Sequence, residues 1–102
     1  EVQVNNSQGD WRRTGGLYGI EDLREPPAKD DQWFAMHVRV EGQRVTVSVD
    51  GKQVVDYVEP DDVERPESFA GRLIDRGTFA LQAHDPGSQV WYKQIEVRPL
   101  PE

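Results

Sequence analysis

The stretch from Trp33 to Val58 constrains the fold of this 102-residue chain more than any other part of the sequence. Two successive runs there, Trp33–Val40 and Gln43–Val49, have alternating inward and outward side chains, and Lys52–Val58 follows as the returning run. Strand side chains point to opposite faces in turn, so alternation with period two predicts half-buried strands. Asp50-Gly51 joins the last two runs and is typical of a type I′ turn, which needs positive φ twice. We therefore expect a three-stranded antiparallel meander with the valines of the middle run facing a core.

Further strand-like runs flank this meander. They are Glu1–Asn5, Thr14–Gly19, Thr78–His84 and Gln89–Val97. The last two flank the turn residues Asp85 to Ser88, where Pro86 sets φ and Gly87 accepts positive φ. Ser68–Ile74 could form one helical turn or a loop, and no segment has sustained helical periodicity. Six or seven short strands separated by turns predict an all-β fold, specifically an antiparallel β-sandwich.

Composition excludes several classes of function. The net charge is -7 and no basic stripe is present, so phosphate repulsion argues against a nucleic-acid partner. No apolar run approaches the ~18 residues that a membrane span requires. The chain has no cysteine, which excludes a disulfide framework and a thiolate metal site. Two histidines are too few for a His-rich metal motif.

The best candidates for a site lie on the polar faces of two runs. Gln82 and His84 share the outer face of the first closing run, and His84 ends that run beside a turn. Glu1 and Gln3 form a similar polar pair at the start of the chain. A carboxylate and an imidazole on one concave sheet could transfer a proton or hold a divalent cation. The alternative is that all four are ordinary solvated side chains.

Aromatic residues offer a second kind of site. Trp91 and Tyr18 lie in strand-like runs, as do other Trp and Tyr residues of the chain. Aromatic rings can stack on sugar faces, and the commoner alternative is that strand aromatics pack in a core.

Four stretches together resemble the 3-keto-disaccharide hydrolase domain family. They are EVQV at Glu1–Val4, TGGLYG at Thr14–Gly19, VDGKQVVDY at Val49–Tyr57 and GTFALQAHDPGSQVWYKQIEVRPL at Gly77–Leu100. The closing LQxH…V-x-(F/Y)-(R/K)-(N/Q)-I pattern is the most specific. The resemblance implies a concanavalin-like jelly roll with a concave, sugar-facing surface. It also implies that residues 1–102 are one partial domain, the C-terminal part of a longer one whose N-terminal strands precede Glu1, so the jelly roll is expected to be incomplete.

The same resemblance implies action on glycosides oxidised to a ketone at C3, with the glycosidic bond cleaved by elimination and hydration. By matching positions, Glu1 and His84 become candidates for the base or a ligand of a divalent cation. Lys93 stands where the family usually has arginine, and Lys93 or Gln82 would polarise the ketone. Gln3, Tyr18, Gln82 and Trp91 would contact the substrate.

The resemblance further implies a bacterial, extracytoplasmic protein, periplasmic or secreted, with a carbohydrate as its partner. Two rivals remain at this point: a non-catalytic carbohydrate-binding module and a sandwich that mediates protein contacts. Open sheet edges usually become covered by pairing, so the partial domain is also expected to form a homo-oligomer.

Overall fold

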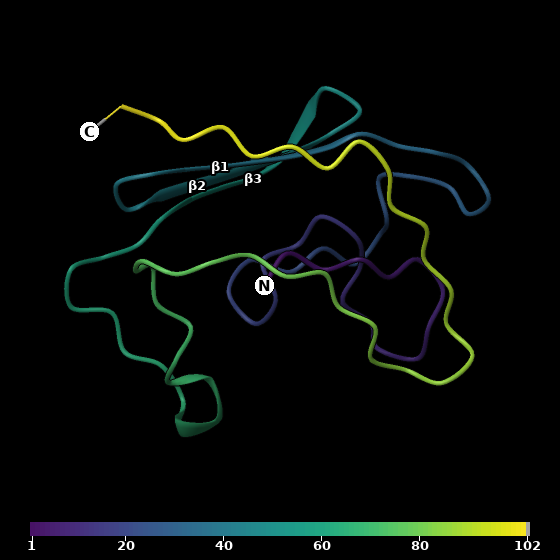
Figure 1. Ribbon diagram of the computed structural model, residues 1–102. Coiled ribbons are helices and arrows are strands. Elements are labelled where there is room, and N and C mark those ends of the chain that lie inside the picture. The colour runs from purple at the N-terminus through teal and green to yellow at the C-terminus, as the bar shows by residue number, and fades with distance from the viewer. Residues whose placement is uncertain (102) are drawn as a thin grey trace.

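The predicted meander is confirmed in the computed structural model of the chain, which describes residues 1–101. Its strands are β1 (Met36–Glu41), β2 (Arg44–Val49) and β3 (Lys52–Val58), paired antiparallel in the order β1-β2-β3 (Figure 1). The first strand begins at Met36 rather than at Trp33, and the other two have nearly the predicted bounds.

The β2–β3 hairpin closes with the turn that its residues predict. Asp50 and Gly51 have φ values of 49° and 79°, the positive pair of a type I′ turn. The Asp50 carboxylate also accepts a hydrogen bond of 2.9 Å from the amide of Ala35, and the Asp50 amide donates to the Ala35 carbonyl at 2.8 Å. These two bonds join Ala35, the residue before β1, to the turn between β2 and β3.

The sheet has one apolar and one polar face, set by its register. Val47 of β2 lies opposite Val38 of β1 and Val55 of β3, so valines gather on the inner face. Val47 is 0% exposed, and the buried cluster around it extends beyond the sheet to Leu17. The predicted inward orientation of the middle valines is therefore confirmed.

The outer face carries exposed ion pairs between neighbouring positions. Arg39 pairs with Glu41 at 2.9 Å, and Arg44 pairs with Asp56 across the β2–β3 ladder at 2.6 Å. The bond from Arg44 lowers the pKa of the Asp56 carboxyl. These charges keep the outer face wet and leave the inner face to form the core.

The N-terminal segments pair with one another beneath the inner face, as irregular extended chain. Amide-to-carbonyl bonds join Gln3 to Gly16 and Thr14 to Asn5, both at 2.9 Å. Val2 and Leu17 form an isolated antiparallel bridge there, as do Leu17 and Glu21, and Gly15 interrupts the pattern with a φ of 91°. The two predicted strands are thus neighbours but not a regular ladder. Their apolar side chains supply the layer on which the sheet packs.

The closing segment differs from its prediction. Neither Thr78–His84 nor Gln89–Val97 is a strand, although the intervening turn is present with Gly87 at a φ of 82° and a Ser88-to-Asp85 bond of 3.2 Å. The segment is extended and almost wholly exposed. Alternation makes a run suitable for a strand, but a strand also needs a neighbour for its backbone groups, and no ladder forms here.

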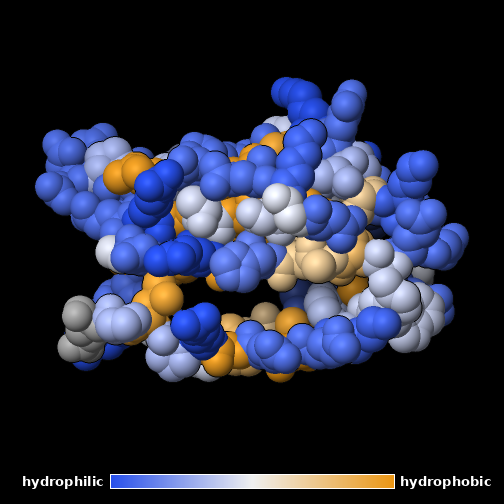
Figure 2. Space-filling model, turned by 90° about the horizontal axis from the view of Figure 1, so that it is seen from above, coloured by the Kyte–Doolittle hydropathy of each residue, from blue (hydrophilic) through white to orange (hydrophobic). Residues whose placement is uncertain are grey.

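The confirmed fold class is all-β, with an open three-stranded sheet. The only helical element among residues 1–101 is the 3-10 turn η1 (Glu67–Phe69), which overlaps the start of Ser68–Ile74, where the sequence predicts one helical turn or a loop. No helix in this part of the chain is long and apolar enough to cross a membrane. Figure 2 shows a hollow between two slabs of the molecule, with apolar side chains along its margin.

Candidate functional site

The pairing of the N-terminal segments brings Glu1 next to Tyr18. The Tyr18 amide donates to the Glu1 carbonyl at 3.0 Å. Gln3 follows on the same segment, where its side-chain amide donates to the Arg12 carbonyl at 3.4 Å. Three residues predicted from the sequence to belong to the site, Glu1, Gln3 and Tyr18, therefore lie together on the two paired N-terminal segments.

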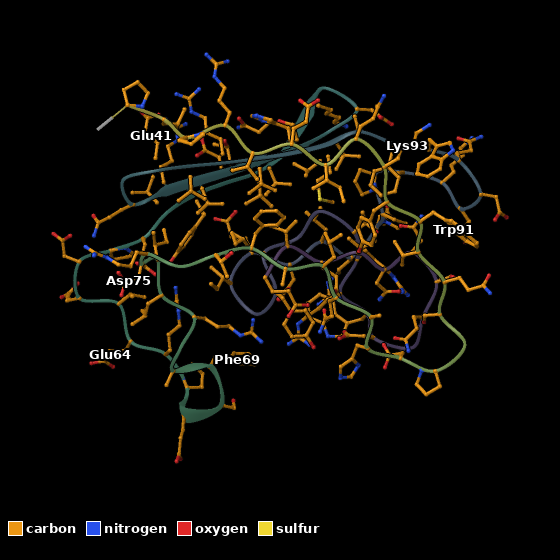
Figure 3. All side chains as sticks on the ribbon, viewed as in Figure 1. Glu41, Glu64, Phe69, Asp75, Trp91 and Lys93 are labelled. Carbon is orange, nitrogen blue, oxygen red and sulfur yellow. The ribbon has the colours of Figure 1, made fainter. Side chains whose placement is uncertain are left out.

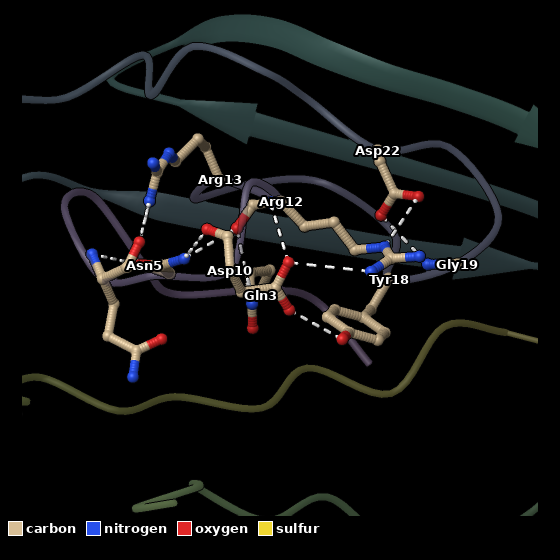
Figure 4. A network of polar contacts seen from close by, with 9 residues as sticks. Gln3, Asn5, Asp10, Arg12, Arg13, Tyr18, Gly19 and Asp22 are labelled. Carbon is tan, nitrogen blue, oxygen red and sulfur yellow. Dashed lines mark hydrogen bonds and ion pairs between the residues drawn. The ribbon is translucent and has the colours of Figure 1, made fainter. Parts of the chain in front are cut away.

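A polar network fixes the hydroxyl end of Tyr18 (Figure 4). The phenol donates to the Asp10 carboxylate at 2.7 Å, and the Arg12 side chain bonds to Asp22 at 3.2 Å. The guanidinium of Arg12 also stacks over the Tyr18 ring, 4.6 Å from its centroid. The ring and its hydroxyl are thus held on two sides, which gives Tyr18 one orientation.

The network shifts the titration of its members in opposite directions. The Arg12 amide and the Tyr18 hydroxyl both donate to Asp10 and lower the pKa of its carboxyl. The bond to Asp10, followed by burial, raises the pKa of the Tyr18 phenol. Tyr18 is therefore a neutral hydrogen-bonding group at ordinary pH, and not a base.

Arg72 completes the cluster from a distant part of the sequence. Its guanidinium lies 4.4 Å from the centroid of the Phe69 ring and 5.0 Å from that of Tyr18. The two rings meet edge to face, with centroids 6.4 Å apart. One guanidinium nitrogen of Arg72 lies 3.9 Å from the Glu1 carboxylate, too far for a hydrogen bond but close for an ion pair.

A groove of about 340 Å³ opens beside this cluster, between the inner face of the sheet and the loops beneath it. Glu1 and Arg72 belong to its wall together with apolar side chains. The lining residues are Glu1, Val2, Leu17, Ile20, Val38, Val40, Val45, Tyr57, Glu59, Gly71, Arg72, Leu73 and Ile74. An apolar groove with a few convergent polar groups is the usual form of a small-molecule site, and this volume is within the typical range of ~300–1,000 Å³.

The residues predicted on the closing segment lie elsewhere. The imidazole Nδ1 of His84 is 2.9 Å from Asp85, its own neighbour, and Gln82 is exposed. Lys93 stacks over the Trp33 ring at 4.2 Å, and Trp91 is 68% exposed. Figure 3 labels Trp91 and Lys93 on the side of the view away from Phe69.

The structure therefore divides the predicted site residues into two groups. Glu1, Gln3 and Tyr18 are together, and no hydrogen bond or ion pair within residues 1–101 joins them to the closing segment. Arg72 was missed from the sequence, because the loop before the closing runs has no periodicity that would show which side chains turn inward. Its only signal is a basic residue near the aromatic Phe69.

The cluster places a carboxylate beside a guanidinium, that of Arg72. Among the described residues, no group of three or more His, Cys, Asp or Glu side chains converges. The Glu1 carboxylate faces a guanidinium, which competes with a cation for its oxygens. A base and a cationic donor side by side can take a proton from one atom of a ligand and stabilise charge on another.

Comparison with known proteins identifies the family. Searches of curated proteins and of solved structures returned no match. A family model described as the 3-keto-alpha-glucoside-1,2-lyase-like domain matches residues 1–98, nearly the whole chain. The expected resemblance is thereby confirmed, and with it a carbohydrate-related role. The chain belongs to the 3-keto-alpha-glucoside-1,2-lyase-like domain family.

Proposed function

We propose that this domain cleaves glycosides that carry a ketone at C3 of the sugar, by elimination followed by hydration. Family membership supports the substrate class. The observation that carries the proposal in the structure is the Glu1 carboxylate, which lines an apolar groove 3.9 Å from the guanidinium of Arg72. Base, cation and apolar wall are the groups that this chemistry needs.

The reaction follows from the acidity that the ketone confers on C2. The base takes the C2 proton, and the electron pair of that C–H bond passes into an enolate. When the enolate collapses, a double bond forms between C1 and C2 and the bond from C1 to the glycosidic oxygen breaks. The departing oxygen takes a proton, and water then adds across the double bond to give the free 3-keto sugar.

Glu1 is the first choice for the base, because Glu59, the other carboxylate of the groove, already accepts a hydrogen bond from the Ile74 amide at 3.1 Å and pairs with Arg65 at 3.6 Å. His84 is the second choice, as base or as acid for the departing oxygen, and Lys93 or Gln82 would then polarise the ketone. These roles require the closing segment to approach the groove. Gln3, Tyr18 and Trp91 are proposed as substrate contacts, and Tyr18 is the one already oriented by its neighbours.

Turnover of a 3-keto-glucoside, followed by mass spectrometry, tests the proposal. We expect Glu1→Gln to abolish cleavage and Glu41→Gln, a matched change on the exposed outer face, to leave it unchanged. His84→Ala tests the second choice of base. Cleavage that is as fast in Glu1→Gln as in the wild type would refute the assignment of Glu1, and no cleavage by the wild-type chain would refute the proposed function.

The fold proposed to support this activity is a concanavalin-like jelly roll, of which β1 to β3 form part of one sheet. The apolar alternation of the closing segment supports this, since Phe79, Leu81, Ile95 and Val97 are exposed and would be buried by a second layer. Slow amide hydrogen exchange over residues 78–84 and 89–97 is the expected result. Exchange as fast as in an unfolded peptide would refute the jelly roll.

Location and assembly are further parts of the proposal. We expect an extracytoplasmic bacterial protein, which fractionation of the source cells tests, and a homo-oligomer paired through open sheet edges, which sedimentation velocity tests. Enzyme confined to the cytoplasm, or a stable monomer, would contradict these two expectations respectively.

A non-catalytic carbohydrate-binding domain is the second candidate, favoured by the exposed aromatics. Trp91 is 68% exposed and Trp33 is 59% exposed, with the Lys93 ammonium over the Trp33 ring. Exposed rings can stack on sugars without catalysis. Binding of an unoxidised glycan that Trp91→Ala weakens, without cleavage of the 3-keto form, would favour this candidate over the enzyme.

A further inference from the structure

Arg72 is held rigidly and yet makes no hydrogen bond with its guanidinium. Its backbone is fixed on both sides: the amide donates to the Phe69 carbonyl at 2.9 Å, and its carbonyl accepts from the Arg65 side chain at 3.1 Å. The guanidinium lies against the rings of Phe69 and Tyr18. A long, flexible side chain thus has its position set by contacts that use none of its five donors.

The donors of Arg72 lack an acceptor in the part of the chain that the structure describes. Its Nε is buried without a partner, and the nearest carboxylate, that of Glu1, lies at 3.9 Å. The Arg72 side chain is 24% exposed and lines the groove. Buried polar atoms are nearly always satisfied, so the unpartnered Nε of Arg72, on a side chain that lines the groove, points to an acceptor that the described residues do not supply.

We propose that Arg72 binds the C3 ketone oxygen of the sugar and stabilises the enolate, while Glu1 takes the C2 proton. This inference rests on the proposed function. The C–H electron pair becomes the C2–C3 double bond, and the ketone π electrons move onto the oxygen that faces Arg72. The proton passes to the Glu1 carboxylate, so the charge moves from Glu1 to an oxygen beside a cation.

The geometry favours Arg72 over Lys93 for this role. The acidic C–H bond and the ketone oxygen are on adjacent carbon atoms, so the base and the oxyanion donor must be near neighbours. Arg72 is the nearest cation to Glu1 within residues 1–101, whereas the Lys93 ammonium lies over Trp33. A guanidinium also presents several donors in one plane, which an ammonium does not.

The test compares Arg72→Ala with Arg39→Ala, the same change on the outer face of the sheet, in the full chain. We expect Arg72→Ala to lower kcat by about 10²–10³-fold, as when one oxyanion donor is removed, with a much smaller effect on KM. Guanidinium ion added to Arg72→Ala should restore part of kcat and should not accelerate Arg39→Ala. A kcat of Arg72→Ala within about threefold of the wild-type kcat would overturn the proposal, because the loss of one oxyanion donor lowers kcat by about 10²-fold or more.

Two further measurements separate this inference from the function on which it rests. A thermal melt shows whether Arg72→Ala folds. If it does not, Arg72→Lys, which keeps the charge, replaces it, and we expect this variant to lower both kcat and the rate of deuterium exchange at C2 of the sugar. Unchanged rates in Arg72→Lys would overturn the role of Arg72. If the wild type neither cleaves the 3-keto-glucoside nor exchanges its C2 proton, the proposed function fails. In that case the role of Arg72 is tested by the affinity for the 3-keto sugar, measured by NMR titration. Equal affinities of the wild type and Arg72→Ala would overturn the proposed contact between Arg72 and the ketone oxygen.

Discussion

Gly19→Ala is the most informative perturbation of the cluster, because Gly19 lies against the ring that holds Arg72. Gly19 has a φ of 74°, where a residue with a Cβ is strained. A Cβ added there would lie 2.7 Å from Cε2 of Phe69, closer than real Cβ contacts. The ring must therefore move, and the guanidinium stacked on it at 4.4 Å must move as well.

The magnitude has two parts, and a control separates them. Left-handed backbone costs a residue such as alanine about 1–2 kcal/mol. Forcing extra volume into packed side chains costs about 1–3 kcal/mol more. Gly51→Ala has nearly the same φ, 79°, with nothing within 4 Å of the added Cβ, so it carries the first cost alone. We expect Gly19→Ala to lose about 1–3 kcal/mol more than Gly51→Ala, the cost of displacing the ring.

Urea denaturation measures both losses as shifts of the midpoint at constant slope. Gly19→Ala should also slow turnover of the 3-keto-glucoside, because the ring positions Arg72, whereas Gly51→Ala should not. Losses of stability that agree within about 0.5 kcal/mol, the scatter expected for independent sites, would refute the contact between Gly19 and Phe69.

Three further predictions concern the core and the polar network. Val47→Ala removes two methyl groups from a fully buried position and should lower the free energy of unfolding by about 2–3 kcal/mol in urea, whereas a loss under 0.5 kcal/mol would contradict the core described above. Thr14→Val should cost about 1–3 kcal/mol, because the buried hydroxyl donates to Asn6 at 2.6 Å and accepts a backbone amide at 2.9 Å; an unchanged urea midpoint would refute this. Folding raises the pKa of Tyr18, so the contribution of Tyr18 to stability is complete below the usual pKa of 10.0 and is lost as pH rises through the folded pKa. Folding lowers the pKa of Asp10, so the contribution of Asp10 to stability is present above pH 3.8 and is lost as pH falls through the folded pKa. Asp10→Asn should therefore let Tyr18 ionise at lower pH in a tyrosinate absorbance titration, and an unshifted titration would show that Asp10 does not hold the phenol.

The meander could be predicted because its determinants are local. Alternation decides which face a strand side chain occupies, and Asp50-Gly51 decides the turn, so register follows within one hairpin. The family could also be predicted, because the motifs keep their order and spacing over residues 1–98.

The candidate site could be predicted only in part. Glu1, Gln3 and Tyr18 lie on two segments that pair close together in sequence, and the motifs mark all three. Arg72 carries no such mark, since its place against Phe69 and Tyr18 depends on how an irregular loop folds back. Loop conformation depends on contacts with distant residues, and periodicity does not report those contacts.

The closing segment shows which features of this protein the sequence predicts and which depend on the tertiary structure. By itself, the sequence determined an all-β chain, a hairpin meander, the Asp85–Ser88 turn and membership of a lyase-like family. Only the tertiary structure decided that Thr78–His84 and Gln89–Val97 lie extended and exposed, and that Glu1 lies beside Arg72 in the wall of a groove. The physical reason is that alternation is a property of one segment, whereas a ladder or an ion pair is a property of two segments and of the space between them.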